Sequence, residues 1–449
     1  MTHTQPRVRI SVVGCGYLGA VHAAAMAHLG HEVIGIDTDE QRIASLSSGV
    51  APFFEPGLDD LLTETLASGR LRFTTDPRSL ADTQVHFVCV GTPQREDSEA
   101  ADLSYLAAAI ATLAEHAAPG SLIVGKSTVP VGTAAGLVAD LADSRPDLGL
   151  VWNPEFLREG FAVRDTLQPD RLVYGLQEGA EGARHRQQID EVYAALLDDT
   201  QVVVTDLATA ELVKVAANSF LAMKISFINA MAQLCDATGG DVVDLADALG
   251  HDTRIGRRFL GAGIGFGGGC LPKDIKAFRH RAEEIGASLA SGLINEVEQI
   301  NLAQRDEVVQ RVSAWFDGDV RDRRIAVLGA AFKPDSDDIR ESPALQIAAR
   351  LAAAGAEVRV TDPQALPVAR SRGPQSLSYV DSLDTCLDGA EAVLLLTEWS
   401  EYRALDPHLA GRAVAERRIF DGRLALDPDK WASAGWHYVS VGRVDRAPR

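Results

Sequence analysis

The sequence predicts an α/β protein with two Rossmann-like domains joined by a central helical domain with long helices. Near both ends of the 449-residue chain, short apolar strands alternate with helices. In each of these regions a glycine turn follows the first strand, and an aspartate ends the next. Between them, two long helical stretches replace the alternation. We therefore predict domains over residues 1–205, 206–318 and 319–449.

The first strand, turn and helix carry the pattern of a dinucleotide-binding site. Residues 8–13 form a β-branched run, GCGYLG follows at 14–19, and strong helix formers continue over 20–29. In this pattern the first glycine makes a tight turn, the second lets a pyrophosphate approach the helix amino terminus, and the third permits close helix packing. We assign cofactor contacts to Gly14, Gly16, Tyr17, Leu18 and Gly19.

The second strand, residues 32–37, ends in an acid that favours NAD. Asp37 lies about 20 residues after the glycines, where a carboxylate accepts hydrogen bonds from a ribose diol. An acid at this position disfavours a 2′-phosphate, so NAD is expected rather than NADP. Arg42 is close enough in sequence to bind such a phosphate, which leaves NADP as the alternative.

Two later strands bring threonines to the ligand edge of the predicted sheet. Residues 85–90 lead to Thr92, and residues 122–130 contain Thr128 near their end. Ligands gather at the carboxyl ends of the strands in such sheets, so both threonines are candidates for cofactor contacts. Threonine at a strand end is more often part of a turn, which is the alternative.

The segment NPEFLREG at 153–160 supplies two carboxylates to the first domain. Glu155 and Glu159 are four residues apart, so in a helix they would share one face and can work as an acid–base pair. A solvated helix face is the alternative for two glutamates at this spacing. The segment is a candidate catalytic element on these grounds.

The central region begins with an apolar helix that carries two polar residues one turn apart. Residues 208–237 are apolar on most faces, which is typical of a helix in a core or an interface. Lys214 and Asn218 lie on the same side and need polar partners there. Catalytic groups occur in such settings; a lysine that reaches solvent at a domain boundary is the alternative. A second long helix is expected over 291–316.

The segment GFGGGCLPKD at 265–274 is the most informative part of the chain. Its glycines lack a Cβ and so permit the backbone to come close to a ligand. Lys273 lies near Cys270 and favours the thiolate over the thiol. We therefore predict a reactive cysteine; a buried core cysteine after a flexible loop is the alternative.

The last domain repeats the strand and turn pattern without the full glycine set. Strand-like runs occur at 324–329 and 357–363, and the second ends in an acid as before. Two alanines follow Gly329, so this crevice is expected to hold something other than a dinucleotide, and a nucleotide-sugar diphosphate would suit it. The candidate cations for a diphosphate are Lys333, Arg340 and Arg423. Each of these, taken singly, is more often solvated.

Composition and charge exclude several classes of protein. The net charge of −20 argues against nucleic acid as a partner, because phosphate binding needs clustered lysine and arginine. The five cysteines are odd in number and scattered, which indicates reduced thiols and no metal site. Residues 1–7 lack the apolar stretch of a signal peptide, and no uninterrupted apolar run approaches the about 18 residues of a membrane span. A cytoplasmic enzyme without membrane association is expected.

Together these motifs resemble the UDP-glucose/GDP-mannose dehydrogenase family over nearly the whole chain. The segments that carry the resemblance are 14–19, 127–130, 153–160, 214–218, 265–274, 332–334 and 338–343. The resemblance implies oxidation of the C6 alcohol of a nucleotide sugar to the carboxylate, UDP-glucose to UDP-glucuronate, with two NAD used in one active site. It also implies a homodimer formed through the central domain.

The resemblance assigns the covalent chemistry to Cys270. Its thiolate would attack the intermediate aldehyde to form a thiohemiacetal, and a second oxidation would give a thioester that water hydrolyses. A covalent hold keeps the aldehyde from escaping between the two oxidations. Lys214 and Asn218 would stabilise the oxyanion, a role in which one preorganised donor is often worth a factor of about 100 to 1,000.

The proton transfers fall, by the same resemblance, to four other residues. Asp274 and Thr128 resemble residues that position a water and help to remove the first proton. Glu155 is the candidate base for thioester hydrolysis, and Glu159 is placed near the nicotinamide, although the division between the two glutamates stays open.

Further contacts are implied by matching motifs. Those to the cofactor are Glu159 and Arg340, in addition to Arg42, Thr92 and Thr128, which follow or end strands of the first domain. Those to the substrate are Glu155, Phe156, Leu157, Lys214, Asn218, Arg254, Phe259, Gly267, Phe332, Lys333 and Arg423. Among them, Arg254 matches a motif whose arginine reaches the sugar bound to the neighbouring subunit.

Other functions stay open. The same chemistry can act on dTDP-glucose or GDP-mannose, since a uracil and a thymine differ by one methyl, worth only about 1 to 3 kcal/mol in a fitted pocket. A non-catalytic NAD-binding protein is the less favoured alternative, because fold does not fix function. A protein that binds NAD without catalysis has no chemical need for Cys270, Lys214, Asn218 and Asp274 together. A two-electron hydroxy-acid dehydrogenase leaves the cysteine and the last domain unexplained.

Overall fold

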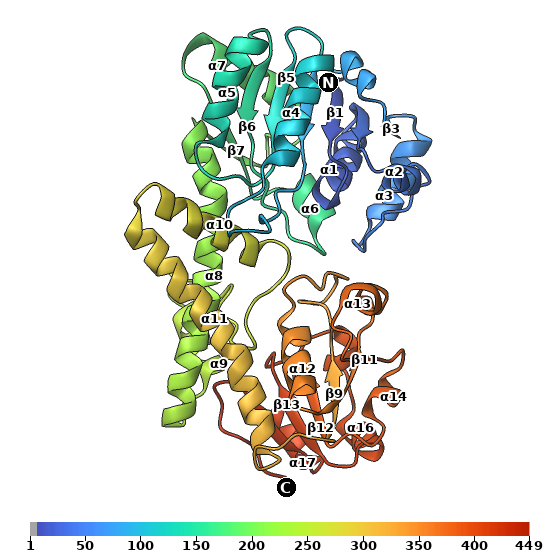
Figure 1. The fold of residues 1–449 in the computed structure, drawn as a ribbon, viewed down its shortest axis with the longest axis vertical. Coiled ribbons are helices and arrows are strands. Elements are labelled where there is room, and N and C mark those ends of the chain that lie inside the picture. Colours follow the sequence, from blue (N-terminus) through green and yellow to red (C-terminus); the bar gives the residue numbers. More distant parts are fainter. Residues whose placement is uncertain (1–6, 449) are drawn as a thin grey trace. The chain divides into compact units, whose positions relative to one another are not determined.

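The computed structural model describes residues 7–448 and shows an α/β protein that folds as two compact units. The first unit comprises Met1–Ala217 and Lys276–Ile285, and the second comprises Asn218–Ile275 and Gly286–Arg449. Each unit is built around one sheet (Figure 1). Residues 1–6, part of the segment used above to judge a signal peptide, lie outside the described residues.

The first unit contains an eight-stranded sheet in the order β3-β2-β1-β4-β5-β6-β7-β8. Neighbouring strands are parallel except β6 and β7, which are antiparallel. The strands are β1 Arg9–Val13, β2 Glu32–Ile36, β3 Leu71–Thr74, β4 Val85–Val88, β5 Leu122–Gly125, β6 Gly149–Trp152, β7 Arg171–Leu176 and β8 Gln201–Asp206. The helices are α1 Tyr17–His28, α2 Glu40–Ser47, α3 Leu58–Ala67, α4 Ser104–His116, α5 Thr133–Ser144, α6 Ala162–Leu167 and α7 Gly179–Tyr193, with a 3₁₀ turn at Pro77–Asp82.

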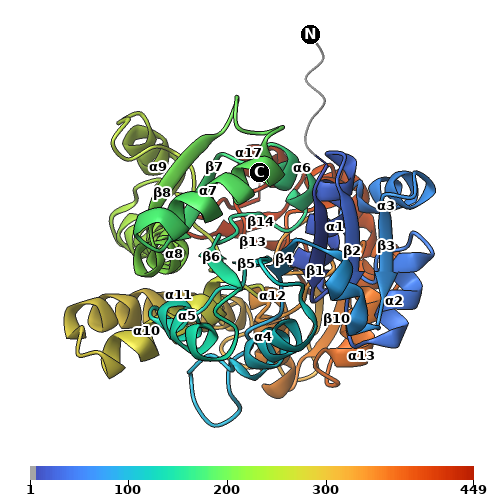
Figure 2. The same cartoon turned by 90° about the horizontal axis from the view of Figure 1, so that it is seen from above.

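The first sheet is buried on both faces, as its continuous apolar strands require. Successive residues of β5, Ile123 and Val124, belong to different apolar clusters, because neighbouring side chains of a strand point to opposite faces. One cluster includes residues of α1, α3, α6 and α7, and the other includes residues of α4 and α5. Figure 2 shows these helices around the sheet.

The second unit contains a six-stranded, wholly parallel sheet in the order β11-β10-β9-β12-β13-β14. The strands are β9 Arg324–Leu328, β10 Glu357–Thr361, β11 Ser378–Tyr379, β12 Ala392–Leu395, β13 Arg418–Asp421 and β14 His437–Ser440. The helices are α9 Val242–Gly250, α11 Ser288–Ala314, α12 Pro343–Ala353, α13 Leu366–Arg372, α14 Leu383–Leu387, α15 Ser400–Arg403, α16 Pro407–Ala413 and α17 Pro428–Ser433. This order repeats that of the first six strands, so the prediction of two Rossmann-like domains is confirmed.

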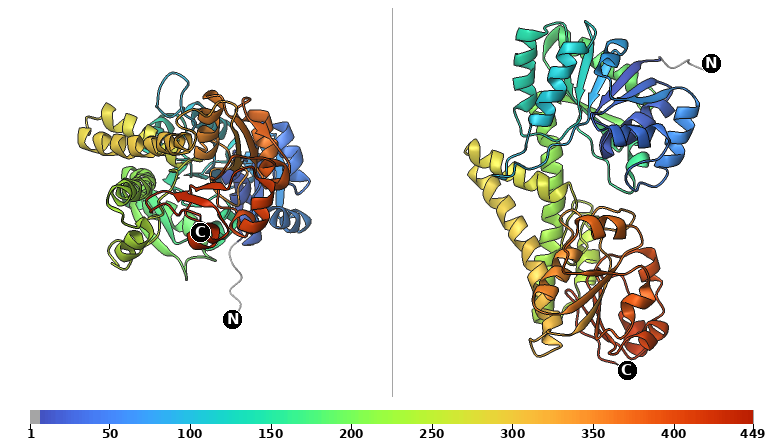
Figure 3. Two further views of the ribbon diagram at one scale, coloured as in Figure 1. Left: turned by 90° about the horizontal axis from the view of Figure 1, so that it is seen from below. Right: turned by 45° about the vertical axis from the view of Figure 1, so that its right-hand side comes forward.

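Two helices contribute residues to both units: α8, Leu207–Thr238, and α10, Leu271–Glu284. Within the second unit α8 lies against α11 (Figure 3). There the hydroxyl of Ser226 donates to the carbonyl of Val297 at 2.7 Å. Among residues 7–448, α8 is the one helix long and apolar enough to cross a membrane, a property that core helices share. Its residues Ile228 and Ala232 are buried in the apolar core of the second unit.

Candidate active site

The turn between β1 and α1 has the geometry of a dinucleotide site. Gly14 has a φ of +89°, which favours glycine, and its N–H donates to the carbonyl of Ile36 at 2.8 Å. A Cβ on Gly19 would lie 1.8 Å from the carbonyl oxygen of Gly14, so only glycine lets α1 come this close. A Cβ on Gly16 would meet no heavy atom within 4 Å, so there is room for a pyrophosphate at the helix amino terminus. The residues present therefore fit a bound dinucleotide.

Asp37 lies directly after β2, and three donors fix its carboxylate. One oxygen accepts the N–H of Cys15 at 2.7 Å, and the other accepts the N–H of Asp39 at 3.0 Å and a guanidinium N–H of Arg42 at 2.9 Å. Arg42 also pairs with the carboxylate of Asp39 at 3.3 Å. An arginine held by two carboxylates is less available to a 2′-phosphate, in agreement with NAD as the cofactor.

Glu55 joins the glycine turn to the NPEFLREG segment, and sequence reasoning missed it. Its carboxylate accepts the N–H of Gly160 and the N–H of Ala162, each at 2.7 Å, and the hydroxyl of Tyr17. Burial, followed by the contact with Glu55, raises the pKa of Tyr17. No sequence signal marks this contact, because Gly160 lies 105 positions from Glu55 along the chain.

The segment 153–160 is not helical, so the condition under which Glu155 and Glu159 would share a helix face is not met. One carboxylate oxygen of Glu155 accepts the N–H of Leu157 at 2.7 Å, a local bond that competes with helix formation. The other pairs with the ammonium of Lys214 at 2.8 Å, and the two side chains are 13% and 6% exposed. The buried Lys214 thus has the polar partner that its apolar helix requires. Its Nζ also lies 5.8 Å from the ring centroid of Phe156.

Lys126 also contacts this segment, through Asn153, and sequence reasoning did not identify it. Its Nζ lies 3.0 Å from Oδ1 of Asn153, which also accepts the hydroxyl of Tyr193 at 2.7 Å. Burial lowers the pKa of Lys126 to about 8. Because Asn153 is two residues before Glu155, this contact helps to fix the loop that carries the glutamate.

The two threonines of the first domain lie together. The hydroxyl of Thr92 donates to the carbonyl of Thr128 at 2.7 Å. The loop after Thr128 is tied to α8, where the carboxylate of Glu211 accepts the N–H groups of Gly132 and Ala134 at 2.7 and 2.6 Å. These bonds order the loop at the carboxyl end of β5, the edge where ligands bind in such sheets.

Cys270 is exposed, whereas the other four cysteines are buried. Burial raises the pKa of Cys89 and of Cys386 to about 12, and it also raises those of Cys15 and Cys235. Cys270 precedes α10, and its carbonyl accepts the N–H of Asp274 at 2.9 Å. Cys270 is therefore the most accessible of the five cysteines.

Asn218 and Asp274 form a buried polar pair in the second unit. The side-chain amide of Asn218 donates to Asp274 at 2.7 Å. The carboxylate of Asp274 is 2% exposed and also pairs with the ammonium of Lys273 at 2.8 Å. The partner expected for Asn218 is thus a carboxylate four residues after Cys270.

The glycines before Cys270 come close to the chain itself. A Cβ on Gly267 would lie 2.2 Å from the carbonyl oxygen of Glu341, and one on Gly269 would lie 2.1 Å from the guanidinium carbon of Arg340. The N–H of Gly268 donates to the carbonyl of Arg340 at 2.9 Å. These glycines let the loop before Cys270 pack on the segment after β9, and their contact with a ligand remains a prediction.

Arg423 connects the segments predicted to bind the substrate. It follows β13, and its guanidinium donates to the carbonyls of Gly265 at 3.2 Å and Phe332 at 3.0 Å. Lys333 has its Nζ 5.2 Å from the ring centroid of Phe332. Arg340 is bound by Asp338, with an ion pair of 2.7 Å.

Arg254 and Phe259 lie on the surface of the second unit. The Arg254 side chain is 87% exposed and pairs with Asp252 at 2.6 Å. Phe259 is 39% exposed and has a φ of +64°, which is uncommon for a large side chain. A contact of Arg254 with a neighbouring subunit remains a prediction.

Comparison with known proteins identifies the family. The NAD binding, central and UDP binding domains of the UDP-glucose/GDP-mannose dehydrogenase family match residues 8–197, 208–303 and 326–428. The UDP-glucose 6-dehydrogenase of Rhizobium meliloti is 40% identical over 98% of this chain and 100% of its own length. The UDP-glucose 6-dehydrogenase TuaD of Bacillus subtilis is 39% identical over 97% of this chain and 93% of its own.

The fold leads to the same family. A UDP-glucose dehydrogenase from Pyrobaculum islandicum superposes with a TM-score of 0.89 and 37% identity, covering 99% of this chain and 100% of that one. The dinucleotide turn lies within the matched NAD binding domain, and Arg423 lies within the matched UDP binding domain. This chain therefore belongs to the UDP-glucose/GDP-mannose dehydrogenase family and is an NAD-dependent enzyme.

Proposed function

We propose that this protein oxidises the C6 alcohol of UDP-glucose to the carboxylate of UDP-glucuronate and uses two NAD per sugar. The observation that carries the proposal is Cys270, the exposed thiol at the start of α10 in a chain whose other cysteines are buried. Full-length relatives named UDP-glucose 6-dehydrogenase support the choice of sugar nucleotide.

The chemistry proceeds through the thiol. The dinucleotide turn with Gly14, Gly16 and Asp37 would hold NAD, which would supply the hydride acceptor for both oxidations, one NAD for each. The alcohol loses a proton and a hydride to become an aldehyde, and the Cys270 thiolate adds to its carbon to form a thiohemiacetal. Loss of a second hydride and of the hydroxyl proton leaves a thioester. Water then adds to the carbonyl carbon, the carbon–sulfur bond breaks, and the thiolate is regenerated with release of the carboxylate.

The neighbouring residues have separate roles in proton transfer and in stabilisation of the developing charge. Lys214 and Asn218 donate hydrogen bonds to the developing oxyanion. Asp274, together with Thr128, positions a water for removal of the first proton. Glu155 is the base for thioester hydrolysis, and its ion pair with Lys214 keeps the carboxylate ordered until the thioester forms. Glu159 lies near the nicotinamide. The remaining cofactor and substrate contacts predicted above, and the domain limits at 205 and 318, are part of this proposal.

We also propose a homodimer formed through the central domain. On α8 the large apolar side chains of Phe220, Phe227 and Leu234 are exposed at intervals of seven residues, a spacing that places them along one side of a helix. On α11, Leu289 and Leu293 are exposed as well. A second copy of the chain covers such a surface in this proposal. Measurement of the molar mass in solution tests it, since a monomer at micromolar concentration would contradict it.

The proposal places the enzyme in the cytoplasm, in agreement with its reduced cysteines. Its substrate is tested by the rate of NADH formation from UDP-glucose, dTDP-glucose and GDP-mannose at equal concentrations. We expect the highest kcat/KM with UDP-glucose. A higher value with GDP-mannose or dTDP-glucose would replace the substrate but keep the chemistry. Absence of NADH with all three would favour a non-catalytic NAD-binding protein.

A further inference from the structure

We propose that Asp421 and Tyr438 are positioning residues for nucleotide-sugar binding, because together they hold the turn that presents Arg423. This inference rests on the proposed function, in which Arg423 contributes to the substrate crevice of the last domain. Neither residue belongs to a motif that sequence reasoning singled out, and neither is assigned a contact with substrate or cofactor.

Asp421, the last residue of β13, is fully buried and organises the turn that follows it. One carboxylate oxygen accepts the N–H of Arg423 at 3.0 Å. The other accepts the N–H groups of Ala425 and Leu426, both at 2.8 Å. Burial raises the pKa of Asp421, and the donated hydrogen bonds oppose that rise. A buried carboxylate with several donors around it is a rigid anchor, since each donor would be left unsatisfied without it.

The turn held by Asp421 contains a strained residue. Leu424 has a φ of +53°, a left-handed conformation that leucine rarely adopts. Such a conformation is unfavourable and persists where the surroundings impose it. The residues before and after Leu424 both donate their N–H groups to Asp421. The carboxylate therefore imposes the turn that sets the direction of the Arg423 side chain.

Arg423 is in turn the point where three loops meet. Its Nε donates to the carbonyl of Leu396 at 2.8 Å, directly after β12. Its two terminal nitrogens donate to Gly265 and Phe332, which lie before Cys270 and after β9. Three of its five N–H groups are used in this way, and its Nε also lies 3.4 Å from a carboxylate oxygen of Glu398. A shift of the turn would therefore change both the arginine and the walls of the crevice.

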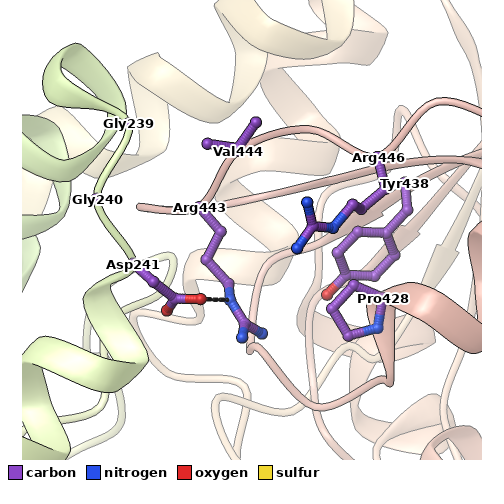
Figure 4. A pocket seen from close by; sticks show the side chains of 8 residues that line it. All are labelled: Gly239, Gly240, Asp241, Pro428, Tyr438, Arg443, Val444 and Arg446. Carbon is purple, nitrogen blue, oxygen red and sulfur yellow. Dashed lines mark hydrogen bonds and ion pairs between the residues drawn. The ribbon is translucent and has the colours of Figure 1, made fainter.

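Tyr438 ties this turn to the neighbouring strand β14. Its hydroxyl donates to Asp421 at 2.9 Å, and the side chain is 1% exposed. The N–H groups of Tyr438 and Arg446 each donate to the carbonyl of the other, at 3.0 and 2.9 Å. Figure 4 shows Tyr438 beside Pro428 at the wall of a pocket of about 200 Å³. Tyr438 thus holds Asp421 from outside the turn, and its hydroxyl can be removed without a change in the turn's own sequence.

The test compares Tyr438→Phe with the matched control Tyr379→Phe. Tyr379 lies in the same domain and donates its hydroxyl to the carbonyl of Pro374 at 3.1 Å, so its variant loses a hydrogen bond of the same kind. We expect Tyr438→Phe to weaken UDP binding, measured by calorimetry, and to raise the KM for UDP-glucose by about threefold to tenfold. The KM for NAD and both constants of Tyr379→Phe should stay within about twofold of the wild type.

Asp421→Asn is the stronger variant, and we expect UDP affinity to fall by about tenfold or more, since the amide would face donors with its own N–H groups. If it does not fold, Tyr438→Phe still decides the question. Unchanged UDP affinity in Tyr438→Phe, or an equal loss in both tyrosine variants, would overturn the inference. Failure of the wild-type protein to bind UDP would overturn the proposed function, and this inference with it.

Discussion

The turn after β1 and the turn after β9 begin alike. Gly14 and Gly329 have φ values of +89° and +111°. The N–H of Gly14 donates to the end of β2, and the N–H of Gly329 donates to the carbonyl of Thr361 at the end of β10, at 2.8 and 2.9 Å. The residue after each glycine donates to the aspartate beyond the second strand, Asp37 in one turn and Asp362 in the other.

The two turns differ in the second residue after the glycine and in the space beside it. In the first, the next residue is Gly16, whose missing Cβ leaves open space. In the second it is Ala331, which is fully buried and donates its N–H to Asp362 at 3.0 Å. Asp362 also accepts the indole N–H of Trp399 at 3.1 Å. The first turn therefore has open space in which a dinucleotide fits, whereas the second has a buried alanine whose N–H is bonded to Asp362.

The largest effect should come from removing the thiol of Cys270, a change that is expected to leave the cofactor site intact. Cys270→Ala should abolish formation of the acid, because no other described thiol is exposed. The Kd for NAD, measured by fluorescence titration, should stay within about twofold of the wild type, since the dinucleotide turn is built from other residues. An equal loss of NAD affinity would show that the thiol's role in the second oxidation is misassigned.

The second largest effect should come from filling the open space at Gly16. Gly16→Ala should raise the Kd for NAD by about tenfold or more, because a methyl group would enter the place of the pyrophosphate. The control is Gly136→Ala in α5, where a Cβ also meets no heavy atom within 4 Å. That variant should bind NAD normally and unfold at a slightly higher temperature, since alanine favours helix. Normal NAD binding by Gly16→Ala would break the comparison of the two turns.

The equivalent aspartates of the two turns, Asp37 and Asp362, should differ in their effects: one should chiefly affect NAD binding, and the other should chiefly affect stability. Asp362→Ala should lower the free energy of unfolding by about 3 to 5 kcal/mol, because it leaves several buried donors without an acceptor. Asp37→Ala should cost less stability and chiefly weaken NAD, with UDP affinity unchanged. Urea unfolding and ligand titration of both variants decide this. Similar losses of stability, with NAD affinity intact in Asp37→Ala, would contradict the division of roles.

A smaller effect concerns pH. Burial holds the pKa of Lys126 at about 8, against a usual 10.5. As the pH falls from 10.5 to 8, the unfolded chain takes up this proton before the folded one, so the folded state should lose about 3 kcal/mol over that window. Lys126→Met should remove this loss, whereas the exposed control Lys430→Met should keep it. Parallel stability curves for the wild type and Lys126→Met between pH 7 and 11 would contradict the assignment.

Local patterns predicted the framework well, because strands and glycine turns depend on neighbours in sequence. The spacing of Glu155 and Glu159 would place them on one face only in a helix, whereas Glu155 accepts hydrogen bonds from its own loop and from the distant Lys214. Glu55 and Lys126 were missed for a related reason: their partners are contributed by other strands and loops. The polar partners of Lys214 and Asn218 could be anticipated in kind, but only the fold identified them.

The most direct test of the proposed four-electron oxidation is the amount of NADH formed per molecule of limiting UDP-glucose, with purified enzyme and excess NAD. Two NADH per sugar, together with one carboxylate product, is the result expected from a thiohemiacetal and a thioester on Cys270. One NADH per sugar would mean that the reaction stops at the aldehyde, and it would contradict the covalent mechanism.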